Sequence, residues 1–372
     1  MTPRTSPPYR ADHVGSLLRP PELVRARDEH AAGRLSADDL RAVEDEAIRD
    51  AVRKQEEVGL QSATDGEFRR TTWHMDFIDS LGGITHADEE ILVEFHNPTG
   101  TIEWRPAAMR VSDRVTLKEP IFADHFRFLQ SCVTTATPKL TIPSPSMVHF
   151  RGQRAAIDED VYPDLDAFWS DLTTAYAAEV RALGDLGCTY LQFDDTSLAY
   201  LNDPKQRDYA TRMGSDAEHL HEDYIRHINE ALAGRPDEMT VTAHLCRGNF
   251  QSSWVAEGGY DFIAEALFND LGVDGLFLEY DDARSGGFEP LRFVPKNKFV
   301  VLGLVTTKTG ALESKDQLKR RIEEASRHVD IEQLCLSGQC GFSSTVEGNA
   351  LTHDEQWAKL ALIVDTAREV WG

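Results

Sequence analysis

The chain alternates between short apolar runs and longer segments with helical periodicity. Between Ser36 and Val58, apolar residues recur at intervals of three and four, the spacing of one buried helix face. Ser36 is a suitable N-cap for this helix, and Gly59 is a suitable C-terminal stop. Residues 61–65 then have the character of a strand. The pattern therefore predicts a helix followed directly by a strand.

The same unit recurs further along the chain. A second helix is predicted between Phe168 and Leu183, with a strand at 189–193, and the capping-box sequence at 314–317 predicts the start of another helix. Strand candidates lie near His13, Ser62, Leu140, Tyr190, Val241, Leu276, Val301 and Leu334. Strands that alternate with helices of this length form parallel sheets, and eight of them predict an α/β protein with the (β/α)8 fold, a TIM barrel.

Residues 82–120 do not follow this alternation. The segment is rich in Glu and contains Thr and Val, which predicts an insertion, a hairpin or lid, after the second strand. No internal repeat, low-complexity tract or linker divides the sequence. We therefore expect one barrel domain over residues 1–372.

Composition and charge narrow the class of protein. The 372 residues are 41% hydrophobic and 27% charged, and the formal net charge is −24. This acidity argues against nucleic acid and anionic membranes as partners, because both bind basic surfaces. Five cysteines without regular spacing do not form a disulfide framework, and no secretory signal or long apolar run is present. We expect a cytoplasmic protein, and leave open whether it forms a homo-oligomer.

Three of the apolar runs end in residues that bind metals. His244 and Cys246 are two positions apart in a predicted strand, so their side chains point to the same side. Glu279 ends a later run, and Cys340 follows the last one. Imidazole with two thiolates is a donor set that favours zinc. The alternative is that His244 and Cys246 are ordinary core residues.

Other polar residues also follow predicted strands, among them Ser16, Glu67 and Asp194. In a TIM barrel the active site lies at the carboxyl ends of the strands, so these side chains are expected to share one face with the metal-type residues. Alternatives remain open, because Glu67 can pair with a nearby arginine and Asp194 can cap a helix. Trp73 and His74 either line the site or pack in the core.

These residues carry a resemblance to the cobalamin-independent methionine synthase family, specifically to its zinc-bearing catalytic barrel and short stand-alone relatives. The similar segments follow the family's order along the chain, at residues 13–16, 65–67, 192–194, 244–246, 278–279 and 340–341. The resemblance implies a zinc ion that binds the thiol of homocysteine. The ligands it implies are His244, Cys246, Glu279 and Cys340. It further implies that Glu67 and Asp194 hold the substrate ammonium, and the backbone of Gly15 and Ser16 its carboxylate.

The expected activity is zinc-dependent alkyl transfer to a thiol, namely methylation of homocysteine to methionine. In the family, a histidine after the seventh strand is thought to protonate the departing pterin, but residues 305–308 of this chain contain no histidine. The family also has a tryptophan after the third strand, and residues 145–150 of this chain contain none. The methyl donor is therefore open, with His149 and Asp195 as substitute acids. Alternatives are a coenzyme M-like or corrinoid-linked zinc-thiolate transferase or lyase, and a non-catalytic zinc- or thiol-binding protein.

Overall fold

A parallel six-stranded sheet is the main sheet of the structure, a computed structural model that describes residues 4–372. Its order is β12-β11-β10-β9-β8-β7. The strands are β7 (Leu140–Pro143), β8 (Tyr190–Asp195), β9 (Thr240–Leu245), β10 (Gly275–Glu279), β11 (Phe299–Val305) and β12 (Leu334–Gly338). Neighbours in the sheet are also neighbours in sequence, as expected when each strand is joined to the next by a helical crossover.

The N-terminal part of the chain completes the ring. β1 (Ser62–Ala63) pairs in parallel with β6 (Thr137–Pro138), which directly precedes β7. At the other edge, Ala11 forms a parallel bridge with Leu336 of β12. The first segment and the segment after β1 are joined by isolated backbone hydrogen bonds, such as the one from Leu17 N to Gly66 O at 3.1 Å. The strand predicted near His13 is thus reduced to one bridge, although it takes the position that the barrel requires.

A buried polar network holds this short first segment in the barrel. Lys139 Nζ donates to His13 O at 2.5 Å and lies 3.3 Å from Asp12 Oδ1. Tyr190 and Ser62 also donate to the Asp12 carboxylate, at 2.8 and 3.0 Å. Buried charges require such partners. Side-chain bonds therefore replace the backbone ladder that the first strand lacks.

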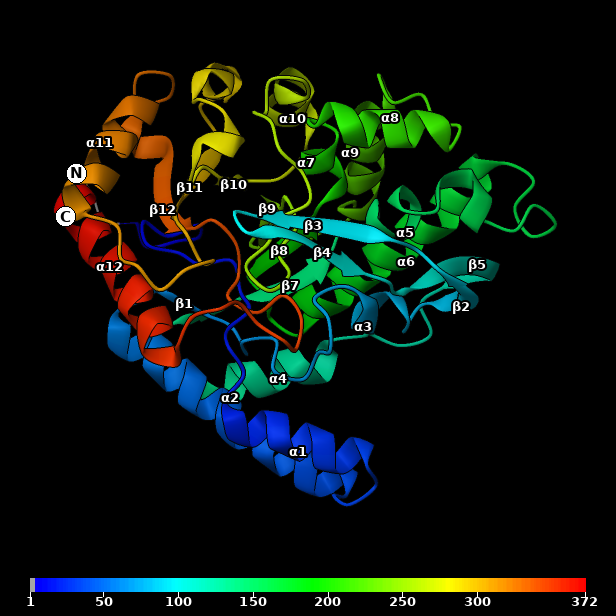
Figure 1. The fold of residues 1–372 in the computed structure, drawn as a ribbon, viewed down its shortest axis with the longest axis horizontal. Helices are drawn as coiled ribbons and strands as arrows, with labels where there is room; N and C mark the ends of the chain where they lie inside the picture. Colours follow the sequence, from blue (N-terminus) through cyan, green and yellow to red (C-terminus); the bar gives the residue numbers. More distant parts are fainter. Residues whose placement is uncertain (1–3) are drawn as a thin grey trace.

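Helices surround the strands (Figure 1). The longer ones are α1 (Pro21–Ala31), α2 (Ala37–Val58), α4 (Ala123–Cys132), α6 (Leu165–Asp185), α8 (Pro204–Arg212), α9 (Leu220–Ala231), α10 (Ala264–Asp270), α11 (Lys315–Ala325) and α12 (His353–Trp371). Short turns of helix are α3 (Met75–Ile78), α5 (Met147–Phe150), α7 (Ser197–Tyr200), and the 3₁₀ segments η1 (Gln153–Ala156), η2 (Ala283–Ser285), η3 (Glu289–Phe293) and η4 (Ile331–Gln333). None of the helices in residues 4–372 is long and apolar enough to cross a membrane.

The predicted helix ends are found where the sequence places them. Ser36 Oγ accepts a hydrogen bond from the third residue of α2, and Gly59 adopts the left-handed conformation at φ 95° that ends it. Ser314 caps α11 in the same way. The reciprocal capping box, however, is recorded at Thr352 and Glu355, at the start of α12.

The insertion after the second strand consists of two antiparallel pairs. β2 (Gly82–Glu90) pairs with β5 (Ala107–Thr116), and β3 (Val93–Asn97) with β4 (Gly100–Trp104). Figure 1 shows β3 and β4 (cyan) across the middle of the barrel. His96 pairs with Trp254 in the loop after β9, which ties the inner hairpin to the barrel. The barrel and its insertion are therefore confirmed.

Candidate metal centre and substrate cavity

Four side chains from three strand ends meet in the interior. They are His244 on β9, Cys246 directly after it, Glu279 at the end of β10, and Cys340 two residues after β12. All four are buried, and one ligand atom of each lies within 4.8 Å of the other three. The two sulfur atoms are 3.4 Å apart, and His244 Nε2 is 4.0 Å from Glu279 Oε1. Sequence reasoning identified all four.

The electrostatics of this cluster favour a cation. The hydrogen bond between the two thiols lowers the pKa of Cys340 and raises that of Cys246 well above its usual value. Burial acts to lower the pKa of His244. The hydrogen bond to Asp194 and the negative charges of Cys340 and Glu279 outweigh burial and raise this pKa to about 9. The surroundings are therefore strongly anionic.

The residues fit a metal ion of the zinc type. Two sulfurs, one imidazole nitrogen and one carboxylate oxygen make a four-member donor set with the composition of a zinc site. Glu279 Oε2 is buried without a hydrogen-bond partner among the described residues, which is costly for a carboxylate that binds nothing. His244 Nδ1 lies 3.4 Å from Asp194 Oδ1. A carboxylate at that nitrogen orients the ring, and Nε2, which lies 3.2 Å from Gln339 O, would bind a metal in place of that contact.

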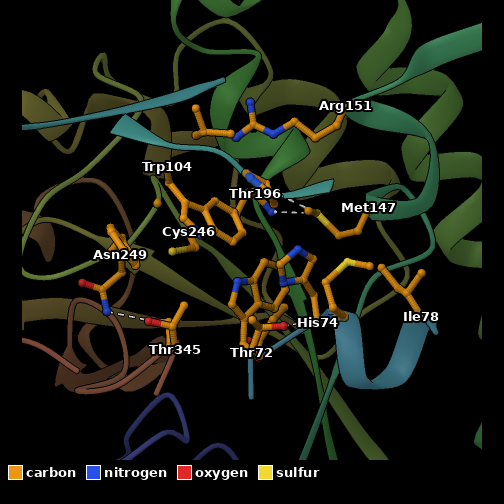
Figure 2. Close-up of a pocket in the computed structure, with 18 of the residues that line it drawn as sticks. Thr72, His74, Ile78, Trp104, Met147, Arg151, Thr196, Cys246, Asn249 and Thr345 are labelled. Atoms are coloured by element: carbon orange, nitrogen blue, oxygen red, sulfur yellow. Dashed lines mark hydrogen bonds between the residues drawn. The ribbon is translucent and has the colours of Figure 1, made fainter. Parts of the chain in front are cut away.

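A cavity of about 300 Å³ opens onto this cluster. Its floor contains Ser16, Glu67, Asp194, His244, Cys246 and Cys340. Its outer wall is largely apolar and includes Ile91, Val93, Phe95, Trp104 and Met109 of the insertion, with Phe250 from the barrel. Figure 2 shows Trp104, His74 and Cys246 at the same cavity, with Arg151 along its edge. The two hairpins of the insertion therefore place apolar side chains opposite the polar side of the cavity, where the metal-type residues lie.

Glu67 is the acid on this floor that is most affected by burial. Its backbone is held at φ 60° with its N–H donating to Asp65 Oδ1 at 2.9 Å, a left-handed conformation that costs energy for a residue with a side chain. Thr141 donates to Oε1 at 3.0 Å and Arg70 lies 3.8 Å from the same atom, while Oε2 is buried without a hydrogen-bond partner in the described part of the chain. Burial raises the pKa of Glu67 to about 7, Asp194 adds to this effect, and Arg70 opposes it.

The structure shows that the neighbouring acids Asp194 and Asp195 have different surroundings, which the sequence did not reveal. Asp194 lines the cavity, accepts from Gln192 Nε2 at 2.7 Å and faces His244. The Asp195 carboxylate instead accepts from Leu198 N at 2.7 Å and from nearby serine hydroxyls, so it caps α7. His149 is bonded to Tyr224 at 2.9 Å. Neither Asp195 nor His149 lines the cavity, so the structure does not place these two candidates where a substitute acid would act.

The remaining predicted residues also have definite places. Ser16 lines the cavity and accepts from Ser343 N at 3.3 Å, while Gly15 lies behind it against Glu67 and Thr141. A Cβ at Gly15 would come within 2.9 Å of a Thr141 carbon, which requires glycine there. Trp73 and His74 both line the cavity.

Several cavity residues were missed by sequence reasoning. The missed residues include Trp104, Met147, Arg151, Thr196, Asn249 and Phe250. Asn249 and Phe250 follow Cys246 closely, and this proximity was a usable signal. Trp104 comes from the insertion, whose path over the barrel cannot be read from its composition.

The whole chain matches a known family. Residues 11–369 match the family described as the catalytic domain of the cobalamin-independent synthase. The chain belongs to this methionine synthase family. It is 48% identical over 370 residues to the Bacillus subtilis protein YxjG, covering 99% of this chain and 96% of that one. It is 23% identical over 333 residues to a methionine synthase of Pyrococcus horikoshii, covering 88% and 84%.

Solved structures agree with this assignment. A Listeria monocytogenes protein described as a vitamin-B12-independent methionine synthase is 36% identical, with a TM-score of 0.78 and coverage of 99% of this chain and 100% of that one. A B12-independent methionine synthase from a Shewanella species, in complex with selenomethionine, shares the fold at 19% identity and a TM-score of 0.71, with 97% coverage of both. The resemblance seen in the sequence is confirmed, and the family supports a methyltransferase.

The buried state of Glu67 predicts a pH-dependent stability. Its pKa is raised from 4.5 to about 7 in the folded protein, so the unfolded chain ionises first as pH rises. Wild type should therefore lose stability relative to Glu67→Gln between about pH 4.5 and 7, by roughly 3 kcal/mol in total. Urea unfolding of both proteins at pH 4.5 and 8 measures this. An equal stability difference at the two pH values would contradict it, and Glu347→Gln on the exposed surface is the control.

Proposed function

We propose that this protein is a zinc-dependent methyltransferase that methylates the thiol of homocysteine to form methionine. The observation that carries the proposal is the buried His244, Cys246, Glu279 and Cys340 cluster beside a cavity that the acids Glu67 and Asp194 also line. The membership of the cobalamin-independent methionine synthase family supports the same reaction.

The cluster accounts for activation of the thiol. A free alkyl thiol has a pKa near 8.5, so only a small part of it is nucleophilic at neutral pH. A bound zinc ion supplies the positive charge that keeps a coordinated thiol deprotonated. His244, Cys246, Glu279 and Cys340 would hold the ion. The buried position of these four ligands keeps bulk water from the nucleophile.

The acids beside the cluster fit the amino group of homocysteine. Glu67 Oε2 has no hydrogen-bond partner among residues 4–372, and Asp194 lines the same floor. An α-ammonium placed between them would satisfy the buried oxygen and stabilise the ionised form of Glu67. Ser16 and the backbone beside it are placed for the carboxylate. A thiol with a sulfonate in place of the amino group would meet these acids unfavourably, so coenzyme M fits less well.

The donor side of the cavity differs from that expected for a folate. Thr306 and Thr307 stand where the family's histidine was expected, after β11. His74 lines the cavity, but burial and the charge of Arg151 lower its pKa to about 3, so its ring is neutral at physiological pH. A pterin leaves readily only when protonated. We therefore propose a methyl donor that is simpler than a polyglutamylated folate or is delivered by another protein.

The metal assignment predicts a selective loss of zinc. Cys246→Ser should remove most of the bound zinc, because a hydroxyl replaces one of two thiolate ligands. Cys188→Ser should keep it, because Cys188 is buried elsewhere with its thiol donating to Tyr190 O at 3.5 Å. Elemental analysis of the purified proteins measures the content. Full zinc occupancy in Cys246→Ser would contradict the ligand set.

The amine site predicts a loss of homocysteine affinity that is separate from zinc binding in Glu67→Gln, whereas Asp194→Asn is compared at equal zinc content because its carboxylate also faces His244. Glu67→Gln and Asp194→Asn should each weaken homocysteine binding about tenfold or more, since a charge-assisted hydrogen bond contributes roughly 1.5–3 kcal/mol. The thiol 3-mercaptopropionate, which has no amine, should bind wild type and both variants about equally. Calorimetry on zinc-loaded protein measures both. Wild-type homocysteine affinity in the double variant would show that these acids have another task.

The donor side predicts slow turnover with methyltetrahydrofolate. A missing positioned acid typically lowers the rate by about 10²–10⁴-fold. Steady-state assays of zinc-loaded protein with homocysteine should therefore show methyltetrahydrofolate, including its polyglutamylated form, to be much poorer than a simpler or protein-bound methyl donor. Folate-dependent turnover on the order of several per second would instead establish an ordinary folate-dependent synthase.

A further inference from the structure

Arg151, which directly follows α5, is the one arginine or lysine that lines the cavity in the described part of the chain. Its side chain is half-buried, and its guanidinium has no hydrogen-bond or ion-pair partner among residues 4–372. The Tyr209 hydroxyl bonds to the backbone carbonyl of Arg151, and the guanidinium carbon lies 5.1 Å from the centroid of the Tyr200 ring. The edge of the cavity, where Figure 2 shows Arg151, therefore carries an unpaired positive charge.

The negative charges of the cavity lie deeper. Glu67 and Asp194 are buried beside the metal cluster, and within residues 4–372 they are the only acidic side chains that line the cavity. In the proposed reaction these two acids hold the ammonium of homocysteine, so the charge that faces the second substrate is that of the thiolate. A donor between this thiolate and Arg151 is matched best when its inner end is positive and its outer end is negative.

An aromatic group forms part of the wall of the same cavity. It consists of Phe95 and Trp104 from the insertion and Phe250 from the barrel. The ring centroid of Phe250 lies 5.2 Å from that of Phe95 and 6.0 Å from that of Trp104. The faces of aromatic rings attract cations, and clusters of such rings recognise quaternary ammonium groups. No acid of the insertion lines the cavity in the described residues, so this wall suits a methylated cation better than one that donates hydrogen bonds.

The size of the cavity favours a compact donor. Its volume of about 300 Å³ is at the lower end of the range for small-molecule pockets, roughly 300–1,000 Å³, and homocysteine must share it. A polyglutamylated folate carries several carboxylates, whereas Arg151 supplies a single positive charge. The match is therefore to a small molecule with one carboxylate.

A donor with a positively charged leaving group also needs no acid. When the homocysteine thiolate attacks a methyl group on a sulfonium or a quaternary ammonium, a new C–S bond forms as the bond to the onium atom breaks. The electron pair of the broken bond stays on that sulfur or nitrogen, which leaves as a neutral thioether or tertiary amine. One negative and one positive charge cancel, and no proton is transferred. This fits a cavity in which the lowered pKa of His74 leaves its ring neutral and His86 is paired with Asp79 at 2.9 Å.

We propose that the methyl donor is a compact zwitterion that carries its methyl group on a sulfonium or quaternary ammonium and pairs its carboxylate with Arg151. The onium group lies against Phe95, Trp104 and Phe250. Arg151 is then the residue that determines donor specificity. The inference rests on the proposed function, because the acceptor is the homocysteine thiolate.

Ligands of matched shape test the inference by binding. Glycine betaine and 3,3-dimethylbutanoate have the same shape and the same carboxylate, but only glycine betaine has a positive charge. Calorimetric titrations use zinc-loaded protein saturated with homoserine, which fills the amino-acid site without a thiol. Glycine betaine should bind about tenfold or more tightly than 3,3-dimethylbutanoate. Trp104→Leu should reduce this difference about threefold or more, because it removes a ring face from the charged ligand.

Substitution of the arginine gives the second arm. Arg151→Met should weaken binding of glycine betaine and of dimethylsulfonioacetate about tenfold or more, because the carboxylate loses its cation. Trimethylsulfonium, which has no carboxylate, should bind wild type and Arg151→Met about equally. Arg151→Lys should retain most of the affinity for glycine betaine. Arg127→Met, which removes an exposed arginine of α4 that pairs with Asp124, is the matched control and should behave as wild type.

Methyl transfer identifies the onium atom. Zinc-loaded protein with homocysteine and a donor that has deuterium-labelled methyl groups should form labelled methionine, which mass spectrometry measures. Transfer from dimethylsulfonioacetate alone would assign a sulfonium, and transfer from glycine betaine alone a quaternary ammonium. In Arg151→Met the KM for the donor should rise about tenfold or more while the KM for homocysteine stays unchanged, a division that a merely structural role would not produce.

The outcomes separate this inference from the proposed function. A zinc-loaded wild type that binds no homocysteine would overturn both. Labelled methionine from methyltetrahydrofolate or methylcobalamin but from neither onium donor would overturn the inference and leave the proposed function in place. Equal affinity of wild type for glycine betaine and 3,3-dimethylbutanoate would also overturn the inference, as would an unchanged affinity for glycine betaine in Arg151→Met.

Discussion

The carboxyl ends of the barrel strands bury four metal-type side chains and two further acids. This concentration of buried negative charge determines which cations and hydrogen-bond donors the surrounding structure must supply. Burial, with a contribution from Asp194, raises the pKa of Glu67, whereas Asp194, Cys340 and Glu279 raise the pKa of His244 against the effect of burial. Cationic side chains neutralise this negative charge only in part. Arg70 lies 3.8 Å from Glu67, and Arg284 is shared among Glu279, Asp281 and Asp282. A bound cation and a substrate ammonium are the natural complements of such a floor.

The barrel and the cluster could be predicted because both follow from local periodicity. Apolar runs that alternate with amphipathic helices indicate parallel strands, and the rule that strand ends converge then brings His244, Glu279 and Cys340 together despite their separation in sequence. The first strand was less predictable. Its backbone ladder is reduced to a bridge at Ala11, and side-chain bonds to Asp12 replace the rest, which no periodicity reveals.

Other features depend on tertiary packing and could not be predicted. Asp194 and Asp195 are adjacent acids of the same strand, and the alternation of side chains sends one to the cavity and the other to the start of α7. The insertion was recognised as an interruption, but its placement over the cavity depends on contacts such as the pairing of His96 with Trp254. The burial of Arg247, whose guanidinium has no hydrogen-bond partner among residues 4–372, could not be predicted because its sequence neighbours give no sign of it.

The two sides of the cavity are built from different kinds of structure, and this bears on how the reaction is divided. The side proposed to bind the thiol is formed by strand ends, whose positions are fixed by the hydrogen bonds of the barrel. The side proposed to face the donor is formed by the insertion and by loops, including Trp104 of β4 and Phe250 after β9. Loops tolerate substitution and change of length better than a closed ring of strands. The thiol chemistry of the family can therefore stay constant while the donor changes, which matches a chain that retains the four metal-type residues and differs where the pterin was expected.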